Sequence, residues 1–273
     1  MIKNLVFSGG SLKGFCYIGV LKYLEENNKL DNIEVLTGTS IGSCIALLIN
    51  IGYKSYELSE IFLNINIEKH LDIDSEHIFD FFTTYGLDSG DNVMKLFSII
   101  LKKKYDETIT FNKLYEKTKI KLIIVGTCLN NKETIYYNYE TYPDLEILKA
   151  IRISISIPFI LKPIFINNKY YVDGGLTNNY PIDIFKDSLE STLGVIVCNS
   201  INKEINSIED FFYASIATNY IEQIKTKIKI YKKNTIEITC NNINFWDFYM
   251  KKEKKQELID NGYDSTKNYF DSI

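Results

Sequence analysis

The sequence contains only two histidines and a single arginine in 273 residues. The histidines, His70 and His77, lie seven positions apart and could share one helix face, but neither is next to a turn that would bring it to a nucleophile. A Ser-His-Asp triad therefore has little support, since it needs a histidine as its base. We expect both histidines to be surface or packing residues.

The cysteines are few, scattered and odd in number, which excludes the usual cysteine-based architectures. No C-x-x-C pair is present, so neither a disulfide framework nor a zinc site is indicated. We expect reduced and mostly buried thiols, as in an intracellular protein. The five positions are Cys16, Cys44, Cys128, Cys198 and Cys240.

Long hydrophobic runs and a strong net charge are also missing. No apolar stretch is long enough to span a bilayer, and residues 1–4 lead straight into a strand without the features of a signal peptide. The net charge of -4 gives no case for nucleic acid as a partner. With 45% hydrophobic and 24% charged residues, the composition is that of a globular protein with a sizeable core. We expect a cytoplasmic location, with at most peripheral membrane contact.

The most informative stretch that is present runs from Val35 to Asn50. A short β-prone run leads into Gly38-Thr39-Ser40-Ile41-Gly42, and an apolar helical run follows at once. This pattern predicts a strand, a sharp turn and a helix with Ser40 at the apex, where glycines two residues to either side allow close backbone approach. A serine at a helix N-terminus, where negative charge is favoured, is a candidate nucleophile.

A second glycine-rich turn, from Gly9 to Gly14, joins a predicted strand at Leu5–Phe7 to a helix. Such a turn presents backbone N–H groups to an anion. A nucleotide phosphate is disfavoured, because Ser11 replaces the second glycine of G-x-G-x-x-G and no G-K-[ST] is present. With an elbow serine thirty residues later, we favour the oxyanion of an acyl-transfer intermediate.

The rest of the chain alternates predicted helices and strands. The polar, uneven segment 52–84 could cover the elbow as a lid. Further on, a hairpin through Asn167-Asn168 delivers Asp173-Gly174-Gly175 at a strand end, where a carboxylate is well placed for chemistry. We predict a three-layer α/β/α sandwich with a mixed, mainly parallel central sheet.

Together these motifs resemble the patatin-like phospholipase family in order and spacing. The matching segments are G-G-S-L-K-G at 9–14, G-T-S-I-G at 38–42, A-I-R-I-S-I-S-I-P at 150–158, and D-G-G at 173–175 followed by N-Y-P at 179–181. The resemblance covers roughly residues 1–200, which we interpret as the acyl hydrolase domain. We expect residues 201–273 to form a helical extension packed on that domain.

The resemblance implies a catalytic dyad without histidine. By carry-over, Ser40 is the nucleophile, Asp173 is the base, and the N–H groups around Gly10, Ser11 and Leu12 form the oxyanion hole. The family usually has a third glycine where this chain has Ser11, and serine suits the loop only if positive φ is not required. No metal cluster or cofactor motif is visible, so we predict calcium-independent activity. The other motif residues are Gly9, Lys13, Gly14, Gly38, Gly42, Gly174 and Gly175.

The predicted function is hydrolysis of fatty-acyl esters through an acyl-enzyme on Ser40, of the phospholipase A or lysophospholipase type. Three alternatives stay open: a lipid acyltransferase, a neutral-lipid esterase, and a catalytically silent lipid-binding module. The predicted partner is a phospholipid or another acyl lipid. The sequence does not determine the oligomeric state.

Two groups of basic residues allow either a lipid or a structural interpretation. Lys13 and Arg152 could meet a lipid phosphate, but bracing the loop or pairing with a carboxylate is favoured. The lysines in 225–233 and 251–255, with the aromatic run 245–249, would suit transient contact with a membrane surface. A solvated helix face with docked aromatics is the favoured interpretation of this second group.

Overall fold

The computed structural model describes residues 1–70, 75–199, 205–206, 208–240, 243 and 250–273. Its centre is a sheet with eight strands in this described part of the chain, in the order β10-β9-β1-β2-β4-β8-β7, with β5 paired to β4. The pairs from β10 to β4 are parallel, whereas β5 and β8 run antiparallel to β4. The predicted mixed, mainly parallel α/β/α architecture is confirmed.

The strands of the central sheet are short, and most of their residues are buried. They are β1 (Asn4–Phe7), β2 (Val35–Thr39), β4 (Lys121–Cys128), β5 (Glu133–Tyr137), β7 (Ile164–Ile166), β8 (Lys169–Asp173), β9 (Thr192–Asn199) and β10 (Thr235–Cys240). A second, two-stranded sheet pairs β3 (Gly86–Asp88) with β6 (Phe159–Leu161) in parallel.

The helices follow the strands in the alternating order that parallel strands require. The α-helices are α1 (Cys16–Glu26), α2 (Ile41–Asn50), α3 (Ser55–Asn64), α4 (Ser75–Thr84), α5 (Asp91–Lys102), α6 (Phe111–Thr118), α7 (Ile147–Ser154), α8 (Gly175–Asn178), α9 (Ile208–Tyr231) and α10 (Lys252–Asp271). The 3-10 helices are η1 (Ser11–Phe15), η2 (Ile67–His70), η3 (Pro181–Phe185), η4 (Leu189–Ser191) and η5 (Lys232–Asn234).

Two separate apolar clusters cover the two faces of the sheet. Successive side chains of a strand point to opposite faces, so Leu5 and Phe7 join the larger cluster, with α1, α2 and α10. Val6, between them, joins a smaller cluster that includes Ile182 and Ile224 from η3 and α9. The sheet is therefore sandwiched between two helical layers of unequal size.

The β7–β8 hairpin is shaped by its asparagine turn. Asn167 and Asn168 have φ values of 51° and 59°. Positive φ at both central residues is the condition for the type I′ turn, which fits the twist of the flanking strands. The hairpin register, with Phe165 opposite Tyr170, brings Asp173 beside Gly126 of β4. A local turn signal thus sets where the candidate catalytic carboxylate lies.

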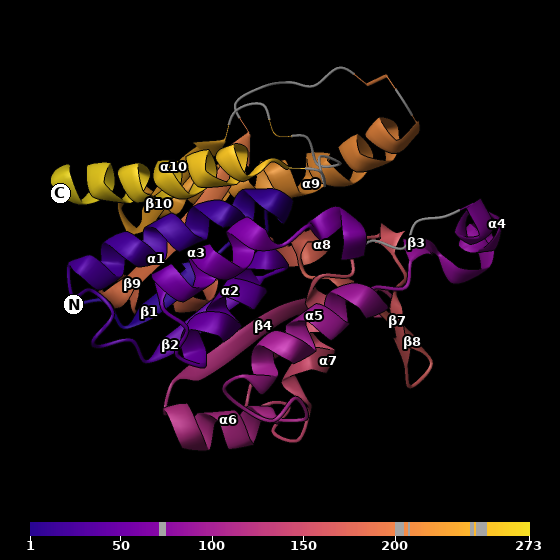
Figure 1. Cartoon of the computed structure of the whole chain (residues 1–273), viewed down its shortest axis with the longest axis horizontal. Helices are drawn as coiled ribbons and strands as arrows, with labels where there is room; N and C mark the ends of the chain where they lie inside the picture. Colours follow the sequence, from indigo (N-terminus) through magenta and orange to yellow (C-terminus); the bar gives the residue numbers. More distant parts are fainter. Residues whose placement is uncertain (71–74, 200–204, 207, 241–242, 244–249) are drawn as a thin grey trace.

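The segment after residue 200 is built into the fold. It contributes the edge strand β10, beside β9, as well as α9 and α10, so it contains a strand that the sequence pattern did not indicate. Figure 1 shows α10 (yellow) running alongside α1, with both chain termini at one end of the molecule and α4 at the other. Among the described residues, no helix combines the length and the hydropathy needed to cross a membrane.

The contact between α1 and α10 depends on glycine, and this generates a stability prediction. A Cβ added to Gly19 would lie 1.8 Å from the carbonyl oxygen of Ile259, which is backbone and cannot rotate away. We expect Gly19→Ala to lower the free energy of unfolding by about 3 kcal/mol or more, because α1 and α10 must move apart. Urea denaturation would measure the change.

Gly52→Ala serves as the matched control. Gly52 has a φ of 85° but nothing within 4 Å of its added Cβ, so only backbone strain is introduced. We expect a cost of about 1–2 kcal/mol there. Equal losses for the two variants would contradict the close packing of the two helices.

Candidate active site

Ser40 lies at the apex of the turn between β2 and α2, as the sequence predicts. Its backbone has φ 53° and ψ -126°, a conformation that non-glycine residues rarely adopt. Its carbonyl oxygen accepts hydrogen bonds from the N–H of Ser43 at 2.9 Å and from the hydroxyl of Ser43 at 2.6 Å. The side chain of Ser40 is therefore held at the start of α2 by a strained but well-bonded turn.

The two glycines of the elbow allow its close backbone contacts. A Cβ on Gly38 would lie 2.2 Å from the carbonyl carbon of Gly42. A Cβ on Gly42 would lie 2.5 Å from the carbonyl oxygen of Ser8, in the neighbouring glycine-rich loop. Both distances are far below normal contact, so the G-x-S-x-G spacing is a steric requirement of this fold.

Ser154, at the end of α7, anchors the elbow from a distant part of the chain. Its Oγ accepts a hydrogen bond from the N–H of Ser40 at 2.9 Å and donates one to the carbonyl oxygen of Val125 at 2.6 Å. Ser154 is fully buried, so neither bond competes with water. Ser154 belongs to the segment 150–158 that resembles the family, but the sequence does not indicate its hydrogen bond to Ser40.

Asp173 ends β8 and lies close to Ser40, as predicted. Its Oδ1 accepts a hydrogen bond from the N–H of Gly175 at 2.6 Å. Its backbone is fixed on both sides, because its N–H donates to the carbonyl oxygen of Ser156 at 2.9 Å and its carbonyl accepts from the Thr127 hydroxyl at 2.9 Å. The second carboxylate oxygen, Oδ2, is buried and has no hydrogen-bond partner within the described part of the chain.

Burial raises the pKa of Asp173 to about 7, because a charged carboxylate is disfavoured away from water. The nearby Ser40 hydroxyl and the Gly175 N–H lower the pKa, but by less. The Ser40 hydroxyl is thus close enough to act on the carboxyl, without forming an ordinary hydrogen bond to Oδ2. Such catalytic contacts often tighten only when substrate binds.

The glycine-rich loop lies beside the elbow and has free donors. In the described residues, the N–H groups of Gly10, Ser11 and Leu12 have no hydrogen-bond acceptor. Ser11 has a φ of 51°, so the loop does require positive φ at the position where the family usually has glycine. The sequence-based condition, that serine suits this loop only where positive φ is not required, is therefore too strict. Serine occupies this conformation at a cost of about 1–2 kcal/mol.

Ser11, Leu12 and Ser40 line a cavity of about 170 Å³. Apart from Ser11, Ser40 and His70, its walls are apolar side chains from the loop, α2, α3, α5 and the segment around β6. They are Leu12, Phe15, Ile41, Cys44, Phe62, Ile65, Val93, Leu96, Phe97, Ile100, Ile155, Ile157, Ile160 and Leu161. An apolar cavity that contains one candidate nucleophile suits a hydrocarbon chain attached to a reactive carbonyl.

His70 lies in the wall of the cavity at Ser40, a position that the sequence did not indicate. His70 is half-buried in η2 and lines the same cavity as Ser40. Among the described residues, it makes no hydrogen bond to Ser40 or Asp173. The side chain of His77 lies outside the described part. Segment 52–84 supplies cavity walls through Phe62, Ile65 and His70, and its role as a lid stays a prediction.

Arg152 braces the structure, as the favoured alternative predicted. Its guanidinium donates hydrogen bonds to the carbonyl oxygens of Ser89 at 2.6 Å and Lys162 at 2.8 Å, and to the Ser156 hydroxyl. Burial lowers its pKa, although Asp91 and Asp88 oppose this effect. With its donors on three protein oxygens, Arg152 holds the chain on both sides of β6 in place.

Lys13 is also buried, beside the thiols of Cys16, Cys198 and Cys240. It is not among the residues that line the cavity. Burial lowers its pKa, and the three thiols raise it by less. This position favours a structural role over contact with a lipid phosphate.

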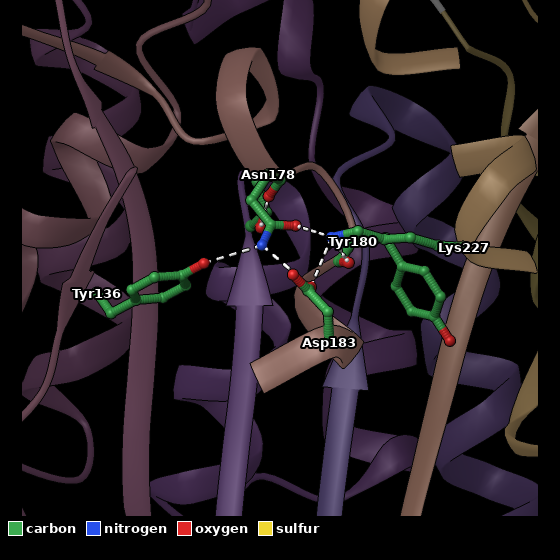
Figure 2. A network of polar contacts seen from close by, with 6 residues as sticks. Tyr136, Asn178, Tyr180, Asp183 and Lys227 are labelled. Carbon is green, nitrogen blue, oxygen red and sulfur yellow. Dashed lines mark hydrogen bonds and ion pairs between the residues drawn. The ribbon is translucent and has the colours of Figure 1, made fainter. Parts of the chain in front are cut away.

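A partly buried polar network at the end of α8 connects the candidate site to the C-terminal segment. Figure 2 shows Asn178 between Tyr136 and Asp183, with Lys227 of α9 reaching into the group. The Lys227 ammonium donates to Asn178 Oδ1 at 2.6 Å, to the Tyr180 carbonyl oxygen at 2.9 Å and to Asp183 Oδ1 at 2.5 Å. The network therefore fixes the short helix that directly follows Asp173.

Two lysines near the C-terminus, Lys227 and Lys255, point into the protein. Lys227 lies in the network, and Lys255 is buried with its ammonium on the carbonyl oxygens of Phe62 and Ile65. Neither can contact a membrane in this fold. The aromatic run 245–249, which the sequence analysis paired with these lysines, lies outside the described residues.

Metal-binding groups are not evident in the part of the chain that the structure describes. No cluster of three or more His, Cys, Asp or Glu side chains there could hold a metal ion. Calcium-independent activity stays a prediction.

Comparisons with known proteins agree on one family. The family model for patatin-like phospholipases matches residues 5–186. An uncharacterized protein of Acanthamoeba polyphaga mimivirus is 32% identical, covering 97% of this chain and 93% of its own length. A probable lipid hydrolase of Invertebrate iridescent virus 6 is 38% identical, covering 67% of this chain and 62% of its own length.

Solved structures agree on the fold. VipD from Legionella pneumophila superposes with a TM-score of 0.65 at 18% identity, covering 99% of this chain and 67% of VipD. ExoU from Pseudomonas aeruginosa, in complex with SpcU, gives a TM-score of 0.56 at 17% identity, covering 99% of this chain and 52% of the other. The fold likeness thus includes the segment beyond residue 186. The chain therefore belongs to the patatin-like phospholipase family, and it is a lipid hydrolase.

Proposed function

We propose that the protein hydrolyses fatty-acyl esters of phospholipids through an acyl-enzyme on Ser40, with Asp173 as the base. The observation that carries this proposal is the position of Ser40. Its strained elbow opens into an apolar cavity, and a buried carboxyl with a pKa of about 7 lies beside it. A hydroxyl is a weak nucleophile until a neighbouring base accepts its proton.

The reaction follows ordinary acyl transfer. The Ser40 oxygen attacks the ester carbonyl while Asp173 takes its proton, and the N–H groups of Gly10, Ser11 and Leu12 stabilise the oxyanion that forms. Asp173 then protonates the leaving alcohol. A water molecule, deprotonated by Asp173, attacks the acyl-enzyme and releases the fatty acid. A base with a pKa near 7 can both accept and return the proton at neutral pH.

The identity of the nucleophile can be tested by covalent labelling. A fluorophosphonate probe should modify Ser40 in the wild type, and mass spectrometry of the digested protein would locate the label. Ser40→Ala should lose both the label and phospholipid hydrolysis. Ser55→Ala, which removes a buried serine whose hydroxyl donates to Glu25 and not to the elbow, should keep the label. Labelling at another serine, or hydrolysis by Ser40→Ala, would refute the assignment.

The role of Asp173 can be tested by pH dependence. The carboxyl accepts a proton only when ionised, so kcat/KM should fall about tenfold per pH unit below pH 7. An aspartate with an ordinary pKa would keep full activity down to about pH 4. Asp173→Asn should lower kcat by about 10²–10⁴-fold and abolish this slope. A profile that is flat between pH 5 and 7 in the wild type would argue against a raised pKa.

The anchoring role of Ser154 gives a further prediction. Ser154→Ala removes one acceptor and one donor from buried backbone groups, so the free energy of unfolding should fall by about 1–3 kcal/mol. The elbow would also loosen, so kcat should fall. Ser156→Ala is the matched control, because Ser156 is equally buried and, among the residues that the structure describes, its hydroxyl bonds only Arg152. A similar loss of kcat in both variants would show that the effect is not specific to the Ser40 contact.

A further inference from the structure

Aromatic side chains from α4, β6, β7 and β8, and from the position before β3, lie close together on the surface at one end of the molecule. The residues are Phe81, Phe82, Tyr85, Phe159, Phe165 and Tyr170, hereafter the aromatic surface. Ring centroids lie 5.6 Å apart for Phe81–Phe82, 6.2 Å for Phe81–Phe159, 5.7 Å for Tyr85–Tyr170 and 4.7 Å for Phe165–Tyr170. Gly86, which follows Tyr85, pairs with Phe159. The rings therefore form two contacting groups, Phe81–Phe82–Phe159 and Tyr85–Tyr170–Phe165, which the pairing of β3 with β6 brings next to each other.

The aromatic surface is exposed to an unusual degree. Phe82 is 82% exposed and Phe165 is 56% exposed, and Tyr85, Phe159 and the neighbouring Ile166 are also exposed. Single exposed apolar residues are common, but a contiguous apolar patch marks an interaction site. Figure 1 places the elements concerned, α4, β3, β7 and β8, at the end opposite the two chain termini.

Two of these aromatic residues have strained backbone conformations. Tyr85 has a φ of 59° and Phe159 a φ of 70°. The left-handed region is unfavourable for bulky residues, and such strain tends to persist where function requires it. Neither ring gains full burial in return. The strain is consistent with a surface shaped for a partner.

The aromatic surface adjoins the candidate active site through β6. Phe159 points outward from β6, while Ile160 and Leu161 of the same strand line the cavity that contains Ser40. Ile157, just before β6, lines the cavity as well. Lys169, opposite Ile166 on the hairpin, adds a positive charge at the edge of the aromatic surface. One strand thus carries both an exposed ring and part of the apolar wall of the cavity.

We propose that the aromatic surface docks on the face of a phospholipid bilayer. This inference rests on the proposed function, because it explains how an acyl chain reaches Ser40. Phenylalanine and tyrosine rings settle at the boundary between headgroups and acyl chains, and lysines bind anionic headgroups. With the rings in that layer, an acyl chain passes from the bilayer into the apolar cavity without crossing water. The position of Phe159 next to Ile160 and Leu161, which line the apolar cavity, favours a bilayer over a protein partner.

Vesicle binding tests this proposal without requiring turnover. Ser40→Ala protein would be floated with vesicles of phosphatidylcholine and phosphatidylserine, and its partition coefficient compared with that of the same protein carrying Phe82→Ser and Phe165→Ser. We expect binding to fall at least about tenfold, because two exposed rings no longer insert. Both sites are exposed, so the thermal unfolding midpoint should not change.

The matched control carries Tyr56→Ser and Ile230→Ser, which remove side chains that are 71% and 64% exposed on α3 and α9. This control should bind vesicles like the parent protein. With Ser40 restored, the aromatic-surface variant should lose hydrolysis of vesicle phospholipid by the same factor as its binding. It should keep hydrolysis of a water-soluble short-chain ester.

Three results would overturn the proposal: no binding of the parent protein to vesicles, equal binding by the aromatic-surface variant and the parent, or equal losses in the two double variants. A parent dimer that the aromatic-surface substitutions dissociate would assign the rings to self-association instead. Failure of the proposed function gives a different pattern. In that case the protein hydrolyses no ester, yet vesicle binding still depends on Phe82 and Phe165.

Discussion

The site depends on one local constraint, the backbone of Ser40. A residue with φ 53° and ψ -126° stays in that conformation only where its surroundings leave no alternative. Here Gly38 and Gly42 allow the chain to pass close to itself, Ser43 bonds the Ser40 carbonyl, and Ser154 bonds its N–H. These contacts come from β2, α2 and α7. Much of the fold on one side of the sheet therefore determines the direction of a single hydroxyl.

Burial has two effects at this site. Burial away from water raises the pKa of Asp173. The cavity beside Ser40 is likewise enclosed by apolar side chains. A more polar site would lower the pKa of the carboxyl and weaken the attraction for a hydrocarbon chain at the same time. The proposed dyad needs no histidine, because a buried aspartate can reach the pKa that histidine has in water.

The parts of the site that sequence predicts are those encoded locally. The G-T-S-I-G spacing, the Asn167-Asn168 turn and the D-G-G strand end each depend on a few adjacent residues, and the structure has all three. Ser154 could not be assigned, because its bond to Ser40 joins positions 114 residues apart. Lys227 and Lys255 have the same local pattern as solvated lysines, so only packing reveals that they point inward. The exposure of Phe82 on α4 and of Phe165 on β7 likewise depends on which faces of these elements lack a neighbour.

The pairing of β1 with β9 has a consequence for where this chain can be divided. The matched region ends at residue 186, before β9 begins, yet β1 carries the glycine-rich loop and pairs with β9 on one side. A fragment cut at that boundary would leave the β1 edge unpaired and remove α9 from the back of the sheet. An engineered fragment should therefore keep β9, α9 and β10 and not stop at the limit of the recognised motif.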